Sequence, residues 1–161
     1  MDEIIDERGT PFNRTTCACK NCVACCKRQP GPLIPGDFER IVDYISEKEG
    51  ISLEEAHDKV TNKLCASPGA LVKSLSDGRT MRVGTIVPRY RKGRCVFLDE
   101  SDRCSIHPAA PFGCAYHDTH MNWPDAHQRS LWAVRAIMND QSYGAMRNRL
   151  PYATNYKPLP Y

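Results

Sequence analysis

Apolar residues recur at helical spacing in residues 37–48. Four of them lie three or four positions apart: Phe38, Ile41, Val42 and Ile45. This spacing places side chains on one face of an α-helix. Gly50 follows, at a position where helices commonly end. The pattern therefore predicts a helix over residues 37–48.

A second helix is expected directly after the first. Ser52 and Glu55 match a capping box, in which each side chain accepts a hydrogen bond from the other residue's backbone amide. The helix would extend to about Leu64 and end at Cys65, because the following "ASPGA" contains proline and glycine. The residues expected to face inward are Leu53, Ala56, Val60 and Leu64.

The pattern changes between residues 70 and 107, where short β-prone runs alternate with turn residues. Asp77 and Gly78 mark a tight turn between two such runs. Further on, "CVFL" and "CSIH" flank "DESDR", which predicts a second hairpin with a longer turn. Cys95 and Cys104 would then lie near its two ends, one on each strand.

The longest helical pattern covers residues 124–150, with a candidate break at Gly144 and an end at Pro151. Length favours one domain with one core. Within this domain of residues 1–161 we expect four regions: an extended lead-in (1–16), a cysteine-cluster region (17–120), the helix (124–150) and an extended tail (151–161). The predicted fold is α+β, a small domain of about three helices with short β-hairpins, stapled by a cysteine-ligated metal centre.

Composition and charge exclude little beyond membrane insertion. Lys plus Arg number 22 and Asp plus Glu 19, a balance that neither demands nor excludes nucleic acid. No apolar run approaches a membrane span, and the acidic first residues do not form a signal peptide. We therefore expect a cytoplasmic protein with no membrane partner. No P-loop, dinucleotide fingerprint or serine nucleophile elbow is present.

The cysteines carry the strongest chemical signal. Nine are present, and five of them crowd into residues 17–26. Because cytosolic thiols are kept reduced, such density favours a metal site over disulfides or a redox thiol pair. Cys19, Cys22 and Cys25 have the spacing that wraps three corners of an iron–sulfur cubane. Cys26 is adjacent to Cys25, so we expect it to serve a second metal or none.

Other thiols would complete the ligand set. The predicted metal ligands are Cys19, Cys22, Cys25, Cys26, Cys65, Cys95, Cys104 and Cys114, enough for two four-thiolate sites. The role of Cys17 stays open. Three histidines form a weaker set: His107, His117 and His120. His117 and His120 could share one metal with Asp118 nearby, or could be polar loop residues.

The run "CKNCVACC", followed by "GRCVFLDESDRCSIHPAAPFGC", resembles the CxxCxxCC cysteine-cluster family of zinc- or iron-chelating domain proteins. The resemblance covers residues 17–120 in two segments, which are separated by a less defined middle part. It implies metal chelation. His107 departs from the tyrosine that members often carry after the isoleucine, so it is either an extra ligand or a local replacement.

These observations lead to one favoured function and two alternatives. We expect a [4Fe-4S] cluster in a small electron-transfer or accessory module. The alternatives are a zinc-binding structural or adaptor protein, and a metal-dependent redox enzyme with a Cys/His site. The expected partner is another protein rather than nucleic acid, because a basic run such as residues 89–94 is more often a solvated hairpin surface. Metal binding would contribute folding free energy, so metal-free protein should be loose.

Overall fold

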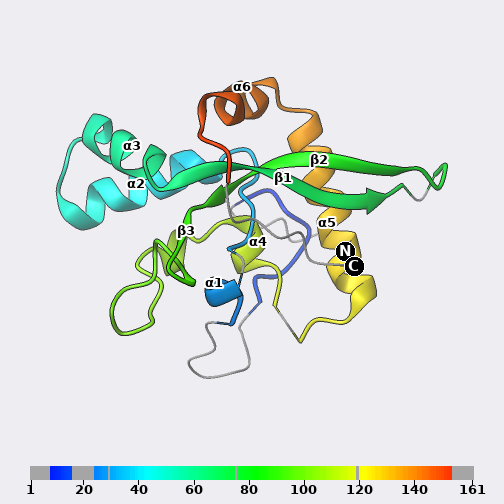
Figure 1. Ribbon diagram of the computed structural model, residues 1–161, viewed down its shortest axis with the longest axis horizontal. Coiled ribbons are helices and arrows are strands. Elements are labelled where there is room, and N and C mark those ends of the chain that lie inside the picture. The colour runs from blue at the N-terminus through cyan, green and yellow to red at the C-terminus, as the bar shows by residue number, and fades with distance from the viewer. Residues whose placement is uncertain (1–7, 16–23, 29, 75, 119, 154–161) are drawn as a thin grey trace.

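The chain folds as an α+β protein in the computed structural model, which describes residues 8–15, 24–28, 30–74, 76–118 and 120–153 (Figure 1). Six α-helices and a 3₁₀ helix lie in these residues, so the expectation of about three helices was wrong. The helices are α1 (Ala24–Arg28), α2 (Asp37–Glu49), α3 (Leu53–Thr61), η1 (His107–Ala109), α4 (Phe112–Ala115), α5 (Trp123–Met138) and α6 (Gln141–Arg149). The strands are β1 (Leu64–Lys73), β2 (Thr80–Pro88), β3 (Tyr90–Arg91) and β4 (Arg94–Cys95).

A long antiparallel hairpin of β1 and β2 runs across the molecule, with α6 on one side and α5 crossing the other (Figure 1). Its turn contains Asp77 and Gly78, as the sequence predicted, and Gly78 takes a left-handed φ of 69°. The predicted helix beyond Ser52 was too long, because Leu64 already pairs with Pro88 in the hairpin. The "ASPGA" segment continues β1 through a register shift that accommodates its proline and glycine.

The helices α2 and α3 pack together at one end of the hairpin (Figure 1). The α2 prediction is confirmed, and Gly50 ends the helix in the left-handed region. The Ser52 hydroxyl accepts a hydrogen bond from the Glu55 amide, so the predicted N-cap is also confirmed. Leu53 was expected to face inward, but 59% of it is exposed because the first turn of α3 projects from the core.

The predicted C-terminal helix is two helices. The chain breaks at Asn139 and Asp140, where the Asp140 carboxylate caps α6 through the Tyr143 amide at 2.8 Å. Gly144, the expected break, lies inside α6. The buried Tyr143 hydroxyl donates to the Leu33 carbonyl at 2.7 Å and accepts from the Ile86 amide at 2.8 Å. This pair of hydrogen bonds fixes α6 against β2.

The hairpin around Cys95 and Cys104 differs from the predicted one. Cys95 ends β4, which pairs with β3 across a turn at Lys92 and Gly93. Cys104 instead forms an isolated antiparallel bridge with Leu98. The segment between them is therefore a compact loop, in which Asp99 donates its amide to the Arg103 carbonyl at 2.8 Å. The two cysteines still lie at the ends of this loop.

Two apolar clusters form the core. The larger one joins α2, α3, the hairpin and α6, and its most buried members include Leu33, Ile41, Val60, Leu64, Ile86, Phe97 and Ile106. The smaller one surrounds Phe112, which stacks on Tyr116 and Trp132. Residues 151–153 of the tail extend along β1 through the Ala66 backbone, and residues 154–161 lie outside the described residues. Among the described helices, none has the length and apolar character that crossing a membrane requires.

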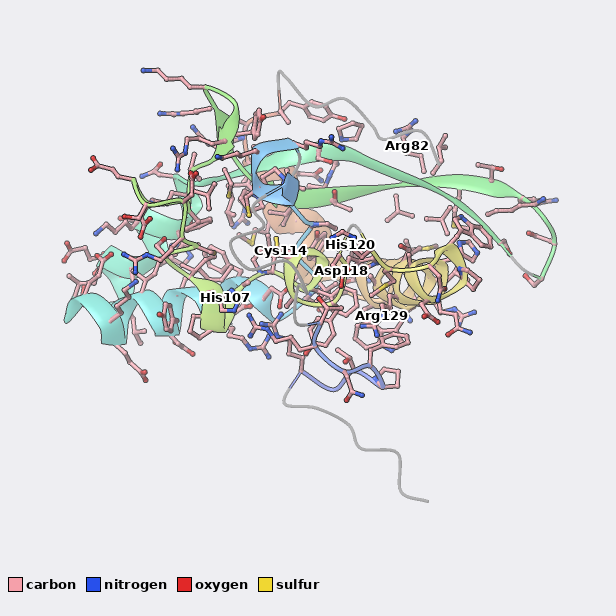
Figure 2. All side chains as sticks on the ribbon, turned by 90° about the horizontal axis from the view of Figure 1, so that it is seen from below. Arg82, His107, Cys114, Asp118, His120 and Arg129 are labelled. Atoms are coloured by element: carbon pink, nitrogen blue, oxygen red, sulfur yellow. The ribbon has the colours of Figure 1, made fainter. Side chains whose placement is uncertain are left out.

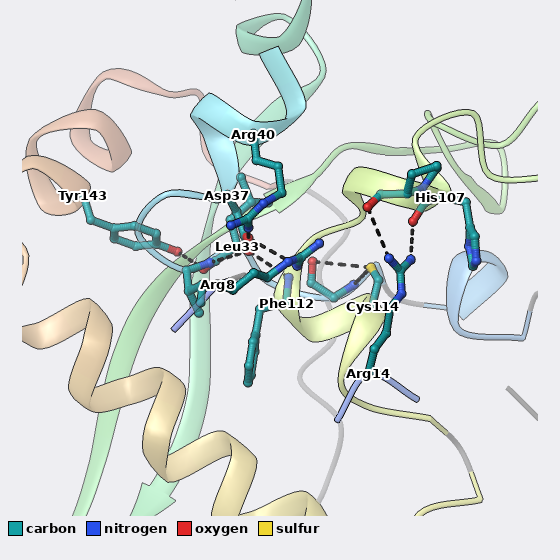
Figure 3. Close-up of polar contacts among 12 residues, drawn as sticks. Arg8, Arg14, Leu33, Asp37, Arg40, His107, Phe112, Cys114 and Tyr143 are labelled. Atoms are coloured by element: carbon teal, nitrogen blue, oxygen red, sulfur yellow. Dashed lines mark hydrogen bonds and ion pairs between the residues drawn. The ribbon is translucent and has the colours of Figure 1, made fainter. Parts of the chain in front are cut away.

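A buried ion network joins the two clusters at Asp37, which has no solvent exposure (Figure 3). Its Oδ2 accepts hydrogen bonds from the Ile34 amide at 3.0 Å and the Phe112 amide at 2.7 Å. Its Oδ1 lies 3.1 Å from Arg40 Nη1 and 3.4 Å from Arg8 Nη1. One carboxylate therefore fixes the start of α2, the start of α4 and the N-terminal segment together.

Candidate metal centre

Four of the described cysteines come from four separate segments. Cys26 lies in α1, Cys95 at the end of β4, Cys104 at the isolated bridge, and Cys114 in α4. Cys26 and Cys104 both pack against the large apolar cluster that contains Cys95. The folding of the loop and the two short helices thus places thiols that are distant in sequence in one region.

The electrostatics of the thiols show that these four interact. Burial raises the pKa of Cys95 to about 12, with further increases from Cys26 and Cys104. Burial is also the main cause of the raised pKa of Cys114. The charges of Cys95, Cys26 and Cys104 raise this pKa further. Like charges disfavour each other's ionisation. A bound cation would offset this effect and favour the thiolate state of these cysteines.

Cys114 lies in close contact with the backbone of Gly31. The Gly31 amide lies 3.2 Å from the Cys114 sulfur, and the same sulfur lies 3.9 Å from the Gly31 carbonyl oxygen (Figure 3). The approach is possible because both Gly31 and Gly113 lack a side chain. An N–H group directed at sulfur stabilises a thiolate, so this amide favours Cys114 as an anionic ligand.

A substitution at this contact gives a direct prediction. A Cβ on Gly31 would lie 2.1 Å from the Gly113 carbonyl carbon and 2.4 Å from the Cys114 nitrogen. Gly31→Ala should therefore displace α4, lower the free energy of unfolding by about 1–3 kcal/mol and weaken metal retention. Thermal unfolding and metal content per chain measure both effects.

Gly144→Ala is the control for that substitution. Nothing lies within 4 Å of a Cβ at this helical position, so alanine should stabilise the protein by about 0.5–1 kcal/mol. Equal melting temperatures and equal metal content for the two variants would contradict the role assigned to Gly31.

Polar contacts hold α1 against the loop that carries Cys95 and Cys104. The Asp102 carboxylate lies 2.7 Å from Lys27 Nζ and 2.8 Å from Arg94 Nη2, so it bridges α1 and β4. The Tyr90 hydroxyl donates a hydrogen bond to the Lys27 carbonyl. Sequence analysis missed Tyr90 and Asp102, since no local pattern shows that they meet α1. Together they position Cys26 beside Cys95.

The N-terminal segment leads directly into the cysteine run. The Arg14 guanidinium donates to the carbonyl oxygens of His107 and Pro108 (Figure 3), and the Thr15 amide donates to the Ala115 carbonyl at 2.8 Å. Cys17, Cys19 and Cys22 lie outside the described residues, as does the side chain of Cys25. The contacts of Arg14 and Thr15 place these two residues beside η1 and beside α4, the helix that carries Cys114.

Cys65 lies apart from the other described thiols. It is buried in β1, and its sulfur lies 3.7 Å from the Val87 carbonyl oxygen. The charge that acts on its pKa is that of Arg89, which opposes the increase caused by burial. This environment is that of a small buried hydrophobic residue in a strand.

The histidines are distributed over different surroundings (Figure 2). His107 is exposed and is the first residue of η1. His117 points at α5, where its Nε2 lies 3.3 Å from both the Ala126 carbonyl and the Ser130 hydroxyl. His120 is exposed, and its amide donates to Asp118 Oδ1 at 2.8 Å. The Nε2 of His117 is therefore engaged by α5, whereas its buried Nδ1 has no hydrogen-bond partner among the described residues.

The pKa of His117 gives a prediction for stability against pH. Burial lowers this pKa below the ordinary 6.5, against the raising effect of the Ala126 carbonyl. The folded protein therefore prefers the neutral imidazole. The contribution of His117 to the free energy of unfolding is fully present above pH 6.5 and is lost as the pH falls through the lowered pKa of the folded state. Between about pH 7 and about pH 5, metal-free protein should lose stability in urea titrations. His117→Gln, which keeps a donor toward Ala126, should lose less; identical pH profiles would contradict this.

No three or more His, Cys, Asp or Glu side chains among the described residues form a group that could hold one metal ion as they stand. A stapling metal centre, as expected from the sequence, is therefore not shown by this part of the chain. The thiols of Cys65, Cys95, Cys104 and Cys114 are free rather than paired in disulfides. The donor chemistry is that of soft thiolate ligands, which suits zinc and iron–sulfur clusters.

Fold and site together define a small α+β protein with interacting thiols beside a cysteine-rich segment. The model of the CxxCxxCC family, described as a "Putative zinc- or iron-chelating domain", matches residues 18–141. The chain belongs to this family, and the resemblance of the cysteine spacing is confirmed. Membership indicates a metal-chelating domain. No curated protein and no solved structure matches the chain.

Proposed function

We propose that the protein holds a [4Fe-4S] cluster on Cys26, Cys95, Cys104 and Cys114 and acts as a small electron-transfer or accessory module. One observation carries the proposal: four separated segments bring together one buried and three partly buried cysteines, and the charges of Cys26 and Cys104 act on the pKa of both Cys95 and Cys114. Without a cation these thiols stay neutral, because burial and like charges disfavour their ionisation. As ligands they neutralise a metal centre and staple the segments.

A cluster and a single zinc ion need different separations of their ligands. Sulfur atoms around one tetrahedral zinc lie about 3.8 Å apart, because Zn–S bonds are about 2.3 Å long, and a cubane of iron and sulfide separates its cysteine ligands more widely. The described thiols form no group that could hold one ion as they stand. A zinc centre on these four cysteines therefore requires their sulfur atoms to move closer together.

The surrounding residues suit a redox centre. When bound, a [4Fe-4S] cluster supplies one-electron chemistry. The apolar cluster around Cys95 excludes water, and the Gly31 amide donates toward the Cys114 sulfur. Lys63 acts on Cys95, and Lys48 acts on Cys104, in the direction that favours the thiolate. Buried surroundings and donors to sulfur are the features that set the potential of such clusters.

The remaining cysteines receive different roles. Cys19, Cys22 and Cys25 stay predicted ligands, available for a second metal beside the proposed centre. Cys65 is assigned to the core rather than to either site, because its thiol faces β2. Cys17 has no assigned role.

A zinc centre on the same thiols is the second candidate, supported by the ligands that converge from a loop and short helices as in structural zinc sites. The enzyme alternative, with a Cys/His site, has weaker support because the His117 ring faces α5. A protein partner in the cytoplasm is part of the proposal, since an electron-transfer or accessory module acts on another protein.

The proposal is tested by an optical spectrum together with iron, sulfide and zinc analysis on protein purified without oxygen. We expect a broad band near about 400 nm with about four iron and about four sulfide per chain. A colourless protein with one or two zinc ions per chain would replace the cluster by a structural zinc centre. A metal-free protein with the same fold would contradict both.

A further inference from the structure

Unpaired positive charge gathers on the part of the surface next to the proposed centre. Arg28 at the end of α1, and Arg91 and Lys92 at the β3–β4 turn, are all exposed. Among the described residues, none of the three forms an ion pair or a side-chain hydrogen bond. We call Arg28, Arg91 and Lys92 the basic edge.

The basic edge is fixed in place by its neighbours rather than by its own charges. The Tyr90 hydroxyl binds the Lys27 carbonyl, which holds the β3–β4 turn against α1. Asp102 bridges Lys27 and Arg94 from the other side. Lys92 and Gly93 both have positive φ values, 49° and 77°, so the turn is tight. The three cations therefore have a defined arrangement beside Cys26 and Cys95.

The arrangement is electrostatically unfavourable in the isolated protein. Arg91 is the direct cross-strand partner of Arg94, and like charges directly opposite on paired strands repel. Asp102 neutralises Arg94, whereas Arg91 forms no ion pair within the part of the chain that the structure describes. A surface that retains crowded, unpaired cations gains free energy when carboxylates from another molecule approach it.

We propose that the basic edge is the docking surface for an acidic face of a partner protein, which it brings to the metal centre. The role of the contact in electron transfer rests on the proposed function, whereas the docking itself does not. Nucleic acid fits less well, because Glu100 is exposed on the adjacent loop and would repel a phosphate backbone, whereas Asp99 there is paired with Arg103. A folded protein can place carboxylates against the basic edge and a cation against Glu100.

The test uses the protein as purified and a short fluorescent polyglutamate peptide, with binding followed by anisotropy at several salt concentrations. Wild-type protein should bind, and salt should weaken the binding. The double variant Arg91→Glu, Lys92→Glu should bind about tenfold more weakly or worse. Lys73→Glu, Arg79→Glu is the matched control, because it changes the charge equally at the distant β1–β2 turn (Figure 1). We expect it to stay within about twofold of wild type.

Three outcomes would overturn the docking surface. They are no binding by wild-type protein, equal losses in the two double variants, and tighter binding of a single-stranded oligonucleotide of equal charge. Metal content is measured on each sample beforehand. Protein without metal that still binds polyglutamate through the basic edge would refute the cluster and leave the docking surface standing. Metal-loaded protein that fails to bind polyglutamate would refute the docking surface and leave the cluster standing.

Discussion

Cys95→Ala is expected to abolish stoichiometric metal binding, whereas Cys65→Ala should leave it intact. Both thiols are buried to the same extent, with 6% of each residue exposed. Cys95 interacts with Cys26 and Cys104, but Cys65 interacts with Arg89. Loss of a residue that only orients a metal ligand lowers metal affinity by about 10- to 100-fold. Cys95→Ala removes a ligand itself, so we expect a larger decrease in metal affinity.

Iron and zinc analysis after gel filtration measures this difference. Each substitution deletes one buried sulfur, so the loss of packing is matched, on the order of 1 kcal/mol. Only Cys95→Ala should also lose the free energy that metal binding adds to folding. Full metal content in Cys95→Ala, or loss of metal in Cys65→Ala, would contradict the ligand assignment.

Asp37→Ala should lower the free energy of unfolding by about 3–5 kcal/mol. The substitution leaves two buried backbone amides, those of Ile34 and Phe112, without their acceptor. It also leaves the Arg8 side chain, of which 1% is exposed, and the partly buried Arg40 without the counter-charge of this carboxylate. Removing one member of a buried ion pair costs more than the pair itself contributes. Urea unfolding followed by circular dichroism measures the loss.

Asp43→Ala provides the control on the same helix. Asp43 is exposed, so its loss should change stability by less than about 0.5 kcal/mol. If Asp37→Ala does not fold, Asp37→Asn is the second variant, because it keeps the shape of the side chain and one acceptor oxygen. It should fold, with a lower free energy of unfolding than wild type and Asp43→Ala. An Asp37→Asn protein as stable as Asp43→Ala would show that the network contributes little.

Local signals in the sequence predicted local structure well. The periodicity of Phe38 and Ile41, the cap at Ser52 and the turn at Asp77 and Gly78 all depend on residues close along the chain. The prediction was wrong at Leu64, where a helical pattern gave way to a strand because β2 supplies a paired partner. That partner lies on another segment, so no local pattern could indicate it. The break at Asp140 had a local signal, an N-cap residue, which the more obvious Gly144 concealed.

The candidate site shows the same division. Cysteine spacing identified the family without reference to structure. It could not show that Cys65 lies in β1 with its sulfur toward β2, because a cysteine in a strand and a cysteine in a loop look alike in sequence. The supporting contacts of Gly31 and Asp102 join segments far apart along the chain. Only the fold brings them together.

The central claim is that one metal centre lies among Cys26, Cys95, Cys104 and Cys114. The most direct test is a crystal structure of protein purified without oxygen, with anomalous diffraction collected at the iron and zinc edges. We expect an anomalous peak bonded to the sulfur atoms of these four cysteines, and we expect it to be strongest at the iron edge. A peak bound instead by His117, Asp118 and His120, or by Cys65, would contradict it.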